Sequence, residues 1–148
     1  MPDSNLEKPV AYLCSSSFSK DYLLGCAEKV KEHEHEEEFV QLFRDKKGIA
    51  ERLLPAYFNA LIRQRDSSMR SGSIAIETLL FVSGSMNISK AISEFGINDA
   101  SEFILFATSK KVADSFIKCS KCKIIKELKL SLANEQSPRI AVSELLSG

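Results

Sequence analysis

The sequence predicts an α+β fold, a single two-layer domain over residues 1–148 in which a mostly antiparallel sheet is covered by helices. Three observations lead to this prediction. With 148 residues, 44% of them hydrophobic and 27% charged, the chain has the size and composition of one domain with a real core. Strand-like and helix-like segments follow one another in the order β-α-β-α-α-α-β-α-β-α. A doubly wound α/β sheet is the competing fold, but no glycine-rich turn leads from a strand into a helix.

The first part of the chain contains two predicted strands and two predicted helices. Residues 9–16 form a short apolar run bounded by proline and serine, which is typical of a strand. In residues 19–33 apolar side chains recur at helical spacing after Ser19, a suitable N-cap. Residues 38–44 alternate as a second strand. The next helix is expected to begin near Pro55, because proline is poorly accommodated inside a helix.

Residues 73–97 are the best-patterned stretch of the chain. They predict two short helices separated by a break at residues 83–85, after a small polar loop over residues 66–73. Asn87 can cap the second helix, and Gly96 is expected to end it in the left-handed conformation. The stretch contains no His and no Cys. Its regular apolar spacing therefore indicates packing or docking rather than chemistry.

The last part of the chain repeats the alternation of strands and helices. Residues 102–107 predict a strand, and the helix after it is expected to be capped by Thr108 or Ser109. Another strand is predicted from Ile124 onward. Residues 137–148 predict a short terminal helix with a proline in its first turn.

Charge is balanced overall but unevenly distributed. Twenty basic and twenty acidic residues cancel, so the net charge gives no support to a general nucleic-acid binder. Residues 28–38 hold six acidic residues against two basic ones, residues 44–70 hold seven basic against three acidic, and residues 110–129 hold seven lysines against two acidic residues. Basic stretches on a neutral protein can form a patch that meets phosphate, so a stand-alone RNA-binding module is one hypothesis.

The sequence also carries expectations about the compartment. No apolar run approaches the roughly 20 residues of a membrane helix, and the polar N-terminus shows no signal peptide. Four cysteines in a chain of this size do not amount to a disulfide scaffold. We expect a cytoplasmic protein, nuclear as well in a eukaryote, with reduced thiols.

Two motifs contain residue types that can bind metals or transfer electrons. Cys119 and Cys122 form a C-x-x-C, but no second ligand pair for zinc is visible, and the motif ends a helix instead of beginning one. The alternating His and Glu of residues 33–38 lack the i, i+4 spacing of a helical metal pair. We interpret them as incidental thiols and a solvated acidic turn, which leaves a thiol or metal enzyme as the least favoured hypothesis. The sequence thus predicts no catalytic residues, no metal, no cofactor, no membrane partner and no small-molecule substrate.

A specific series of residues runs through the two short helices and the break between them. It consists of Glu77-Thr78-Leu79-Leu80, Ser83-Gly84, Asn87-Ile88, Ala91-Ile92 and Phe95-Gly96-Ile97. This series resembles the signature of the small PRPK-binding (TPRKB-like) regulatory subunit of the KEOPS complex. The order of elements agrees over nearly the whole chain, whereas the specific motif covers only residues 77–97.

The resemblance implies a non-catalytic subunit of the complex that installs threonylcarbamoyl on adenosine in tRNA. Members of this family bind the atypical kinase/ATPase subunit of that complex and help to activate it. Archaeal members also bind the 3′ CCA end of tRNA. Many of them carry a basic residue and Gln where this chain has Met86 and Asn87, so tRNA binding by this chain stays open.

Two sets of site residues are expected. Helix-face recognition uses anchors at i, i+3 and i+4, and methionine adapts well to interfaces, whereas Ile92 and Phe95 are assigned to the core. The residues expected to contact the kinase subunit are Met86, Asn87, Ile88, Lys90 and Ala91. The residues expected to contact tRNA, taken from the two basic stretches, are Arg63, Arg65, Lys110 and Lys111.

Overall fold

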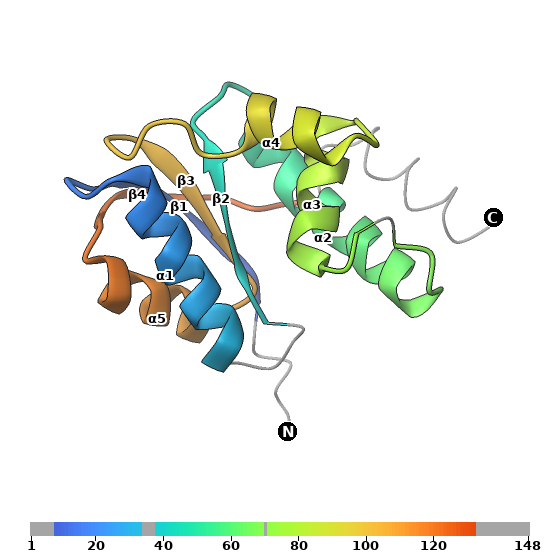
Figure 1. Cartoon of the computed structure of the whole chain (residues 1–148), viewed down its shortest axis with the longest axis horizontal. Helices are drawn as coiled ribbons and strands as arrows, with labels where there is room; N and C mark the ends of the chain where they lie inside the picture. The colour runs from blue at the N-terminus through green and yellow to red at the C-terminus, as the bar shows by residue number, and fades with distance from the viewer. Residues whose placement is uncertain (1–7, 34–37, 70, 133–148) are drawn as a thin grey trace. The chain divides into compact units, whose positions relative to one another are not determined.

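The structure is a computed structural model that describes residues 8–33, 38–69 and 71–132. Its elements, shown in Figure 1, are β1 (Val10–Ser15), α1 (Lys20–His33), β2 (Val40–Arg44), α2 (Ile49–Arg65), α3 (Ile74–Ser83), α4 (Ile88–Phe95), β3 (Phe103–Ala107), α5 (Lys110–Ser120) and β4 (Lys123–Leu128). They divide into two compact units. The sheet unit holds the described residues up to Asp45 and Gly96–Lys129, and the helical unit holds Lys46–Phe95 and residues 130–132. That residues 1–148 form one domain stays a prediction.

The sheet unit is built on four strands in the order β2-β3-β1-β4. β3 pairs antiparallel with both β1 and β2, and β1 pairs antiparallel with β4. β1 and β2 therefore run parallel to each other with β3 between them, which is the split β-α-β arrangement of ferredoxin-like folds. This antiparallel sheet, combined with helices, confirms the predicted α+β fold class.

The core of the sheet unit lies between one face of the sheet and helices α1 and α5, which run side by side (Figure 1). Fully buried members include Leu23 of α1, Leu42 of β2 and Phe116 of α5. β3 is buried along its whole length. Because burial of one large apolar side chain contributes about 1.5–3 kcal/mol, this packing is what holds both helices on the sheet.

α3 is the buried centre of the helical unit and packs against both α2 and α4. Its sequence, IAIETLLFVS, is apolar on nearly every side, and a helix of that kind is expected to be buried. Seven of its ten residues are indeed buried: Ile74, Ala75, Glu77, Thr78, Leu79, Leu80 and Val82. Ser73 caps it as an oxygen acceptor for the Ile76 N–H, at 3.3 Å.

The predicted start of the second helix is wrong. α2 begins at Ile49 and includes Pro55. Proline removes one helical N–H and crowds one carbonyl, a cost of about 3 kcal/mol in a helix interior. Ile49 and Leu53 precede the proline at helical spacing and are both buried, so apolar burial of the first turns offsets that cost.

The predicted left-handed ending at Gly96 is also wrong. Among the described glycines, positive φ values occur at Gly48 and Gly84. Gly96 instead forms an isolated bridge with Phe43 at the end of β2, because the chain is already returning to the sheet. The terminal helix predicted over residues 137–148 lies outside the described residues.

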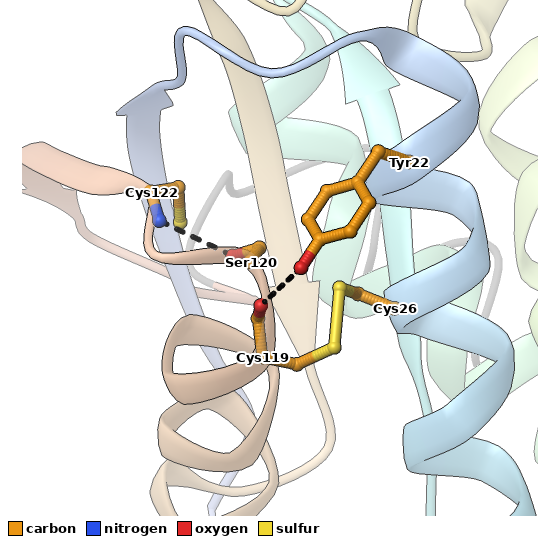
Figure 2. Close-up of a disulfide and its surroundings, with 5 residues drawn as sticks. All are labelled: Tyr22, Cys26, Cys119, Ser120 and Cys122. Atoms are coloured by element: carbon orange, nitrogen blue, oxygen red, sulfur yellow. Dashed lines mark hydrogen bonds between the residues drawn. A yellow bond between two sulfur atoms is a disulfide. The ribbon is translucent and has the colours of Figure 1, made fainter.

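A disulfide joins Cys26 of α1 to Cys119 of α5, with the two Cα atoms 5.8 Å apart (Figure 2). Beside it the Tyr22 hydroxyl donates a hydrogen bond to the Cys119 carbonyl at 3.0 Å. The expectation of four reduced, incidental thiols is therefore wrong for this pair. The two cysteines are 93 residues apart, and only the packing of α1 beside α5 brings them together.

Reduction of this disulfide is expected to lower the free energy of unfolding by about 4–5 kcal/mol, because the bridge restricts a long loop in the unfolded chain. Urea unfolding with and without dithiothreitol measures the loss. The double variant Cys26→Ala/Cys119→Ala is the control, since its unfolding should not respond to the reductant. A wild-type transition that does not move on reduction would contradict the prediction.

Candidate partner-binding site

The turn between α3 and α4 is held by a series of local hydrogen bonds. α3 ends at Gly84, whose φ of 74° is left-handed and favours glycine. The Gly84 N–H and the Ser83 hydroxyl both donate to the Leu80 carbonyl, each at 2.9 Å. The Ser85 N–H then donates to Ser83 Oγ at 3.0 Å. The serines of the predicted break therefore satisfy the backbone groups that the end of a helix leaves open.

Asn87 fixes the start of α4 and confirms the predicted N-cap. Its N–H donates to Ser85 Oγ, and its Oδ1 accepts from the Lys90 N–H, both at 3.0 Å. The Ala91 N–H donates to the Asn87 carbonyl at 2.9 Å, which is the first helical hydrogen bond. A helix of eight residues is too short to be stable alone, since isolated helices below about 12 residues are marginal in water. Its cap and its packing therefore decide its position.

α4 presents two adjacent apolar strips. Ala91 and Phe95 are buried, whereas Ile88 and Ile92 are 36% and 47% exposed. Successive residues of a helix are rotated by about 100°, so Ile88 and Ile92 share one strip next to the buried one. Met86, two residues before the helix, is 60% exposed. We call Met86, Ile88 and Ile92 the apolar surface of α4.

The predicted kinase-contact residues therefore have different environments. Met86 and Ile88 lie on the apolar surface. Asn87 is exposed but serves as the cap, and Lys90 is exposed on the side of α4 away from Ile88. The prediction that Ala91 contacts a partner is wrong, because the residue is fully buried. The assignment of Ile92 to the core is wrong for the opposite reason, whereas Phe95 is buried as predicted.

A pocket of about 130 Å³ opens beside this surface. It is lined by Arg63, Leu80, Phe81, Gly84, Ser85 and Met86. The volume is far below that of a cofactor site, about 300–1,000 Å³, and is close to the ~150 Å³ cavity that holds one benzene. The pocket thus has room for one apolar group of about the size of a benzene ring and is too small for a cofactor.

Arg63 lines this pocket and is held by two neighbours. Its guanidinium lies 4.8 Å from the centre of the Phe81 ring, a cation–π arrangement, and 3.7 Å from Glu77 Oε1. Glu77 is fully buried, and its Oε2 accepts hydrogen bonds from the Ser71 N–H at 2.6 Å and the Ser71 hydroxyl at 2.9 Å. The acid of the family-like motif therefore ties the loop before α3 to α3 itself. The same carboxylate also helps to hold the Arg63 guanidinium in the pocket.

The other predicted tRNA contacts lie at helix ends in both units. Arg65, in the last turn of α2, lies 3.8 Å from Asp66, and Lys110, in the first turn of α5, lies 3.3 Å from Asp114. Lys111 is exposed beside Lys110. Arg63 and Arg65 belong to the helical unit, and the two lysines belong to the sheet unit. The four predicted tRNA contacts are therefore two separate pairs of basic residues, one in each unit.

Metal sites and membrane-spanning helices were also considered for the part of the chain that the structure describes. There, no His, Cys, Asp and Glu side chains gather in a group of three or more that could hold a metal ion. Among the same residues, no helix has the length and apolar character needed to cross a membrane. The acidic turn predicted around His33–Glu38 falls largely outside the described ranges.

Comparison with known proteins assigns the family. The model of the family described as kinase binding protein CGI-121 matches residues 27–145, well over half of the chain. The chain belongs to the CGI-121 family. This membership confirms the resemblance seen in residues 77–97 and supports a kinase-binding regulatory role. A search among curated proteins found no significant match.

Two residues of the candidate site in this CGI-121 member, Ile92 and Phe81, were not predicted from the sequence. Ile92 was assigned to the core because it shares the helical spacing of Ile88 and Phe95. No sequence signal marks it as exposed, since the four apolar residues of α4 span about 100° of its circumference, the usual width of one core-facing stripe. Phe81 lies inside a helix that is apolar on nearly all sides, and no pattern distinguishes it from its buried neighbours.

Asn87→Ala is expected to destabilise the protein by about 1 kcal/mol, because the Lys90 N–H loses its acceptor at the start of α4. Asn87→Asp should retain most of that stability, since a carboxylate also caps helices well. Ser89→Ala, at an exposed position of the same helix, is the matched control. Chemical denaturation of the variants provides the measurement, and equal stability of Asn87→Ala and the wild type would show that the cap does not contribute.

Proposed function

We propose that this protein is a non-catalytic subunit of the KEOPS complex that acts in the cytoplasm and binds and helps to activate the atypical kinase/ATPase subunit. In this way it supports threonylcarbamoyladenosine modification of tRNA. The observation that carries the proposal is the apolar surface of α4, with Met86, Ile88 and Ile92 exposed in a member of a kinase-binding family. The motif of residues 77–97 is the reason for choosing this particular complex.

The proposed contact is an apolar anchor with one basic residue, Arg63, beside it. Interfaces take most of their affinity from a few well-packed residues in desolvated pockets. The pocket beside Met86 offers room for one apolar side chain of the kinase subunit, and Ile88 and Ile92 extend the apolar area along α4. Arg63 in the pocket favours an acidic residue beside that anchor.

Ile88→Glu and Ile92→Glu are expected to weaken binding to the kinase subunit by about 2–4 kcal/mol each, because each would bury an unpaired carboxylate in the interface. The melting temperature of the isolated protein should change little, since both side chains are already partly exposed. Calorimetric titration with the purified kinase subunit gives the affinity, and differential scanning calorimetry gives the stability.

Ser93→Glu is the matched control, because Ser93 is exposed on the same helix about 120° away from the apolar surface. This variant should keep the dissociation constant for the kinase subunit within a factor of about two of the wild-type value. Full affinity in both isoleucine variants would place kinase binding on another surface. A large fall in melting temperature would instead show that these side chains support the fold.

tRNA binding is the second candidate function, and the exposure of the basic side chains favours it. Arg65 and Lys110 have 70% and 72% of their side chains exposed, so either can meet a phosphate at little cost. A stand-alone RNA-binding module would use the same residues and would bind RNA without the kinase subunit. Arg63 is a weaker candidate, because it packs on Phe81 beside Glu77.

Arg65→Glu/Lys110→Glu is expected to weaken tRNA binding and to flatten its salt dependence. Each lost phosphate contact should reduce the slope of log affinity against log salt by about 0.7–0.9. Filter binding of tRNA across a salt series, with and without the kinase subunit, measures both quantities. Lys29→Glu, at an exposed position outside the two basic stretches and the predicted kinase contacts, serves as the charge-reversal control. An unchanged slope in the double variant would exclude Arg65 and Lys110 as tRNA contacts.

A further inference from the structure

β4 forms one outer edge of the sheet. It is the last strand in the order β2-β3-β1-β4, and β1 is its only partner among the described strands. The backbone N–H and C=O groups of a strand point alternately to its two sides, so about half of those in β4 point away from β1. A row of such groups is the template to which an extended chain adds as a further strand. β4 therefore offers a backbone edge to a partner.

β4 is also the most exposed strand of the sheet. Its residues Lys123 to Glu127 are all exposed, whereas β2, the strand at the other edge, has no exposed residue. Ile124 and Ile125 are 46% and 49% exposed. Apolar side chains stabilise a sheet only to the extent that they are buried, and an exposed apolar edge promotes aggregation. The stability of the sheet thus does not account for the two isoleucines.

The register with β1 assigns the side chains of β4 to the two faces of the sheet, because residues directly opposite each other share a face. Lys123 and Lys126 are paired with β1 residues two positions apart, so both lie on the same face. Ile124 is paired with the β1 residue between those two, Cys14, and lies on the other face. Ile125 is the extra residue at the shift in register. The edge therefore has a basic side and an apolar side.

The charge around this edge is strongly positive. Residues 118–129 contain five lysines and one acidic residue, Glu127. The lysines are all exposed, and in the described part of the chain none of them takes part in an ion pair. They are Lys118, Lys121, Lys123, Lys126 and Lys129. Because complementary charge steers and selects partners, this uncompensated edge attracts acidic groups.

The same charge restricts what occupies the edge. Two copies of β4 side by side would bring two lysine-rich segments together, and like charges at close range oppose strand pairing. Lysine on an edge strand commonly prevents self-association in this way. A second copy of this chain is therefore disfavoured, and an acidic strand is favoured.

We propose that the free edge of β4 binds an extended acidic segment of a partner protein, which adds to the four-stranded sheet as a further strand. Acidic side chains at alternate positions of that segment face Lys123 and Lys126, and an apolar side chain between them packs beside Ile124. This surface belongs to the sheet unit, whereas the apolar surface of α4 belongs to the helical unit. The proposal goes beyond the proposed function and does not depend on it.

The first test titrates a fluorescent heptapeptide, in which glutamate and valine alternate, with the full chain in the absence of the kinase subunit. Fluorescence anisotropy should show saturable one-to-one binding that weakens as salt is added. A peptide with glutamine in place of glutamate should bind at least about tenfold more weakly, because it lacks the charge. No saturable binding at millimolar protein, or equal binding of the two peptides, would overturn the proposal.

Lys126→Glu should weaken binding of the acidic peptide about fivefold or more, because it reverses a charge directly opposite the added strand. Lys126→Arg should keep the affinity. Lys29→Glu, at an exposed position on α1, is the matched charge-reversal control and should also bind normally. Full affinity in Lys126→Glu would overturn the proposed register of contact.

Hydrogen exchange of the wild-type backbone, measured by NMR, separates strand addition from a contact through side chains alone. At saturating peptide, exchange of the β4 amides that point away from β1 should slow at least about tenfold, because they gain carbonyl acceptors. Unchanged exchange in β4 would overturn the proposal. Polyuridylate is the competing probe: if it binds more tightly than the peptide and Lys126→Glu abolishes its binding, the edge is an RNA surface and the proposal is wrong.

Discussion

β3 is the strand on which both halves of the sheet depend. It lies between β1 and β2 and supplies the antiparallel partner of each, with Leu105 opposite both Tyr12 and Leu42. All five of its residues are buried. A strand buried on both faces must be apolar throughout, which explains the continuous run FILFA in place of an alternating pattern. Because β1 and β2 pair with β3 and not with each other, its loss would leave α1 and α5 without a continuous sheet to cover.

The pairing of β2 with β3 also determines where the helical unit leaves the sheet. Arg44 at the end of β2 is paired with Phe103 at the start of β3, and Phe43 bridges to Gly96. The segment Lys46–Phe95 therefore leaves and returns at one end of two neighbouring strands, as the loop of a hairpin does. An insertion with closely spaced ends adds little closure entropy per residue. Its helices can carry an interaction surface while the register of the sheet is kept.

The sequence predicted what local patterns determine, and less of what tertiary packing determines. Strand alternation, helical spacing and capping side chains located every described element, including the cap at Asn87. The exposure of Ala91 and Ile92 on α4 was predicted wrongly. Helical spacing shows that these apolar residues lie on one side of the helix, but it does not show which part of that side a neighbouring helix covers. The bridge between Cys26 and Cys119 could not be predicted from spacing, because it depends on two helices distant in sequence packing side by side.

α4 is a short helix that is held in place although two of its apolar residues, Ile88 and Ile92, are exposed. Phe95 anchors its end, with Lys46 Nζ 4.1 Å from the ring centre and the Arg52 guanidinium 5.9 Å away. Arg52 also donates to the Val82 carbonyl at 3.0 Å, in the last turn of α3, where the helix dipole favours a cation. These contacts hold the buried strip of α4 independently of Ile88 and Ile92. The fold therefore does not require the exposed strip to be apolar, which is consistent with the proposed contact between this strip and the kinase subunit.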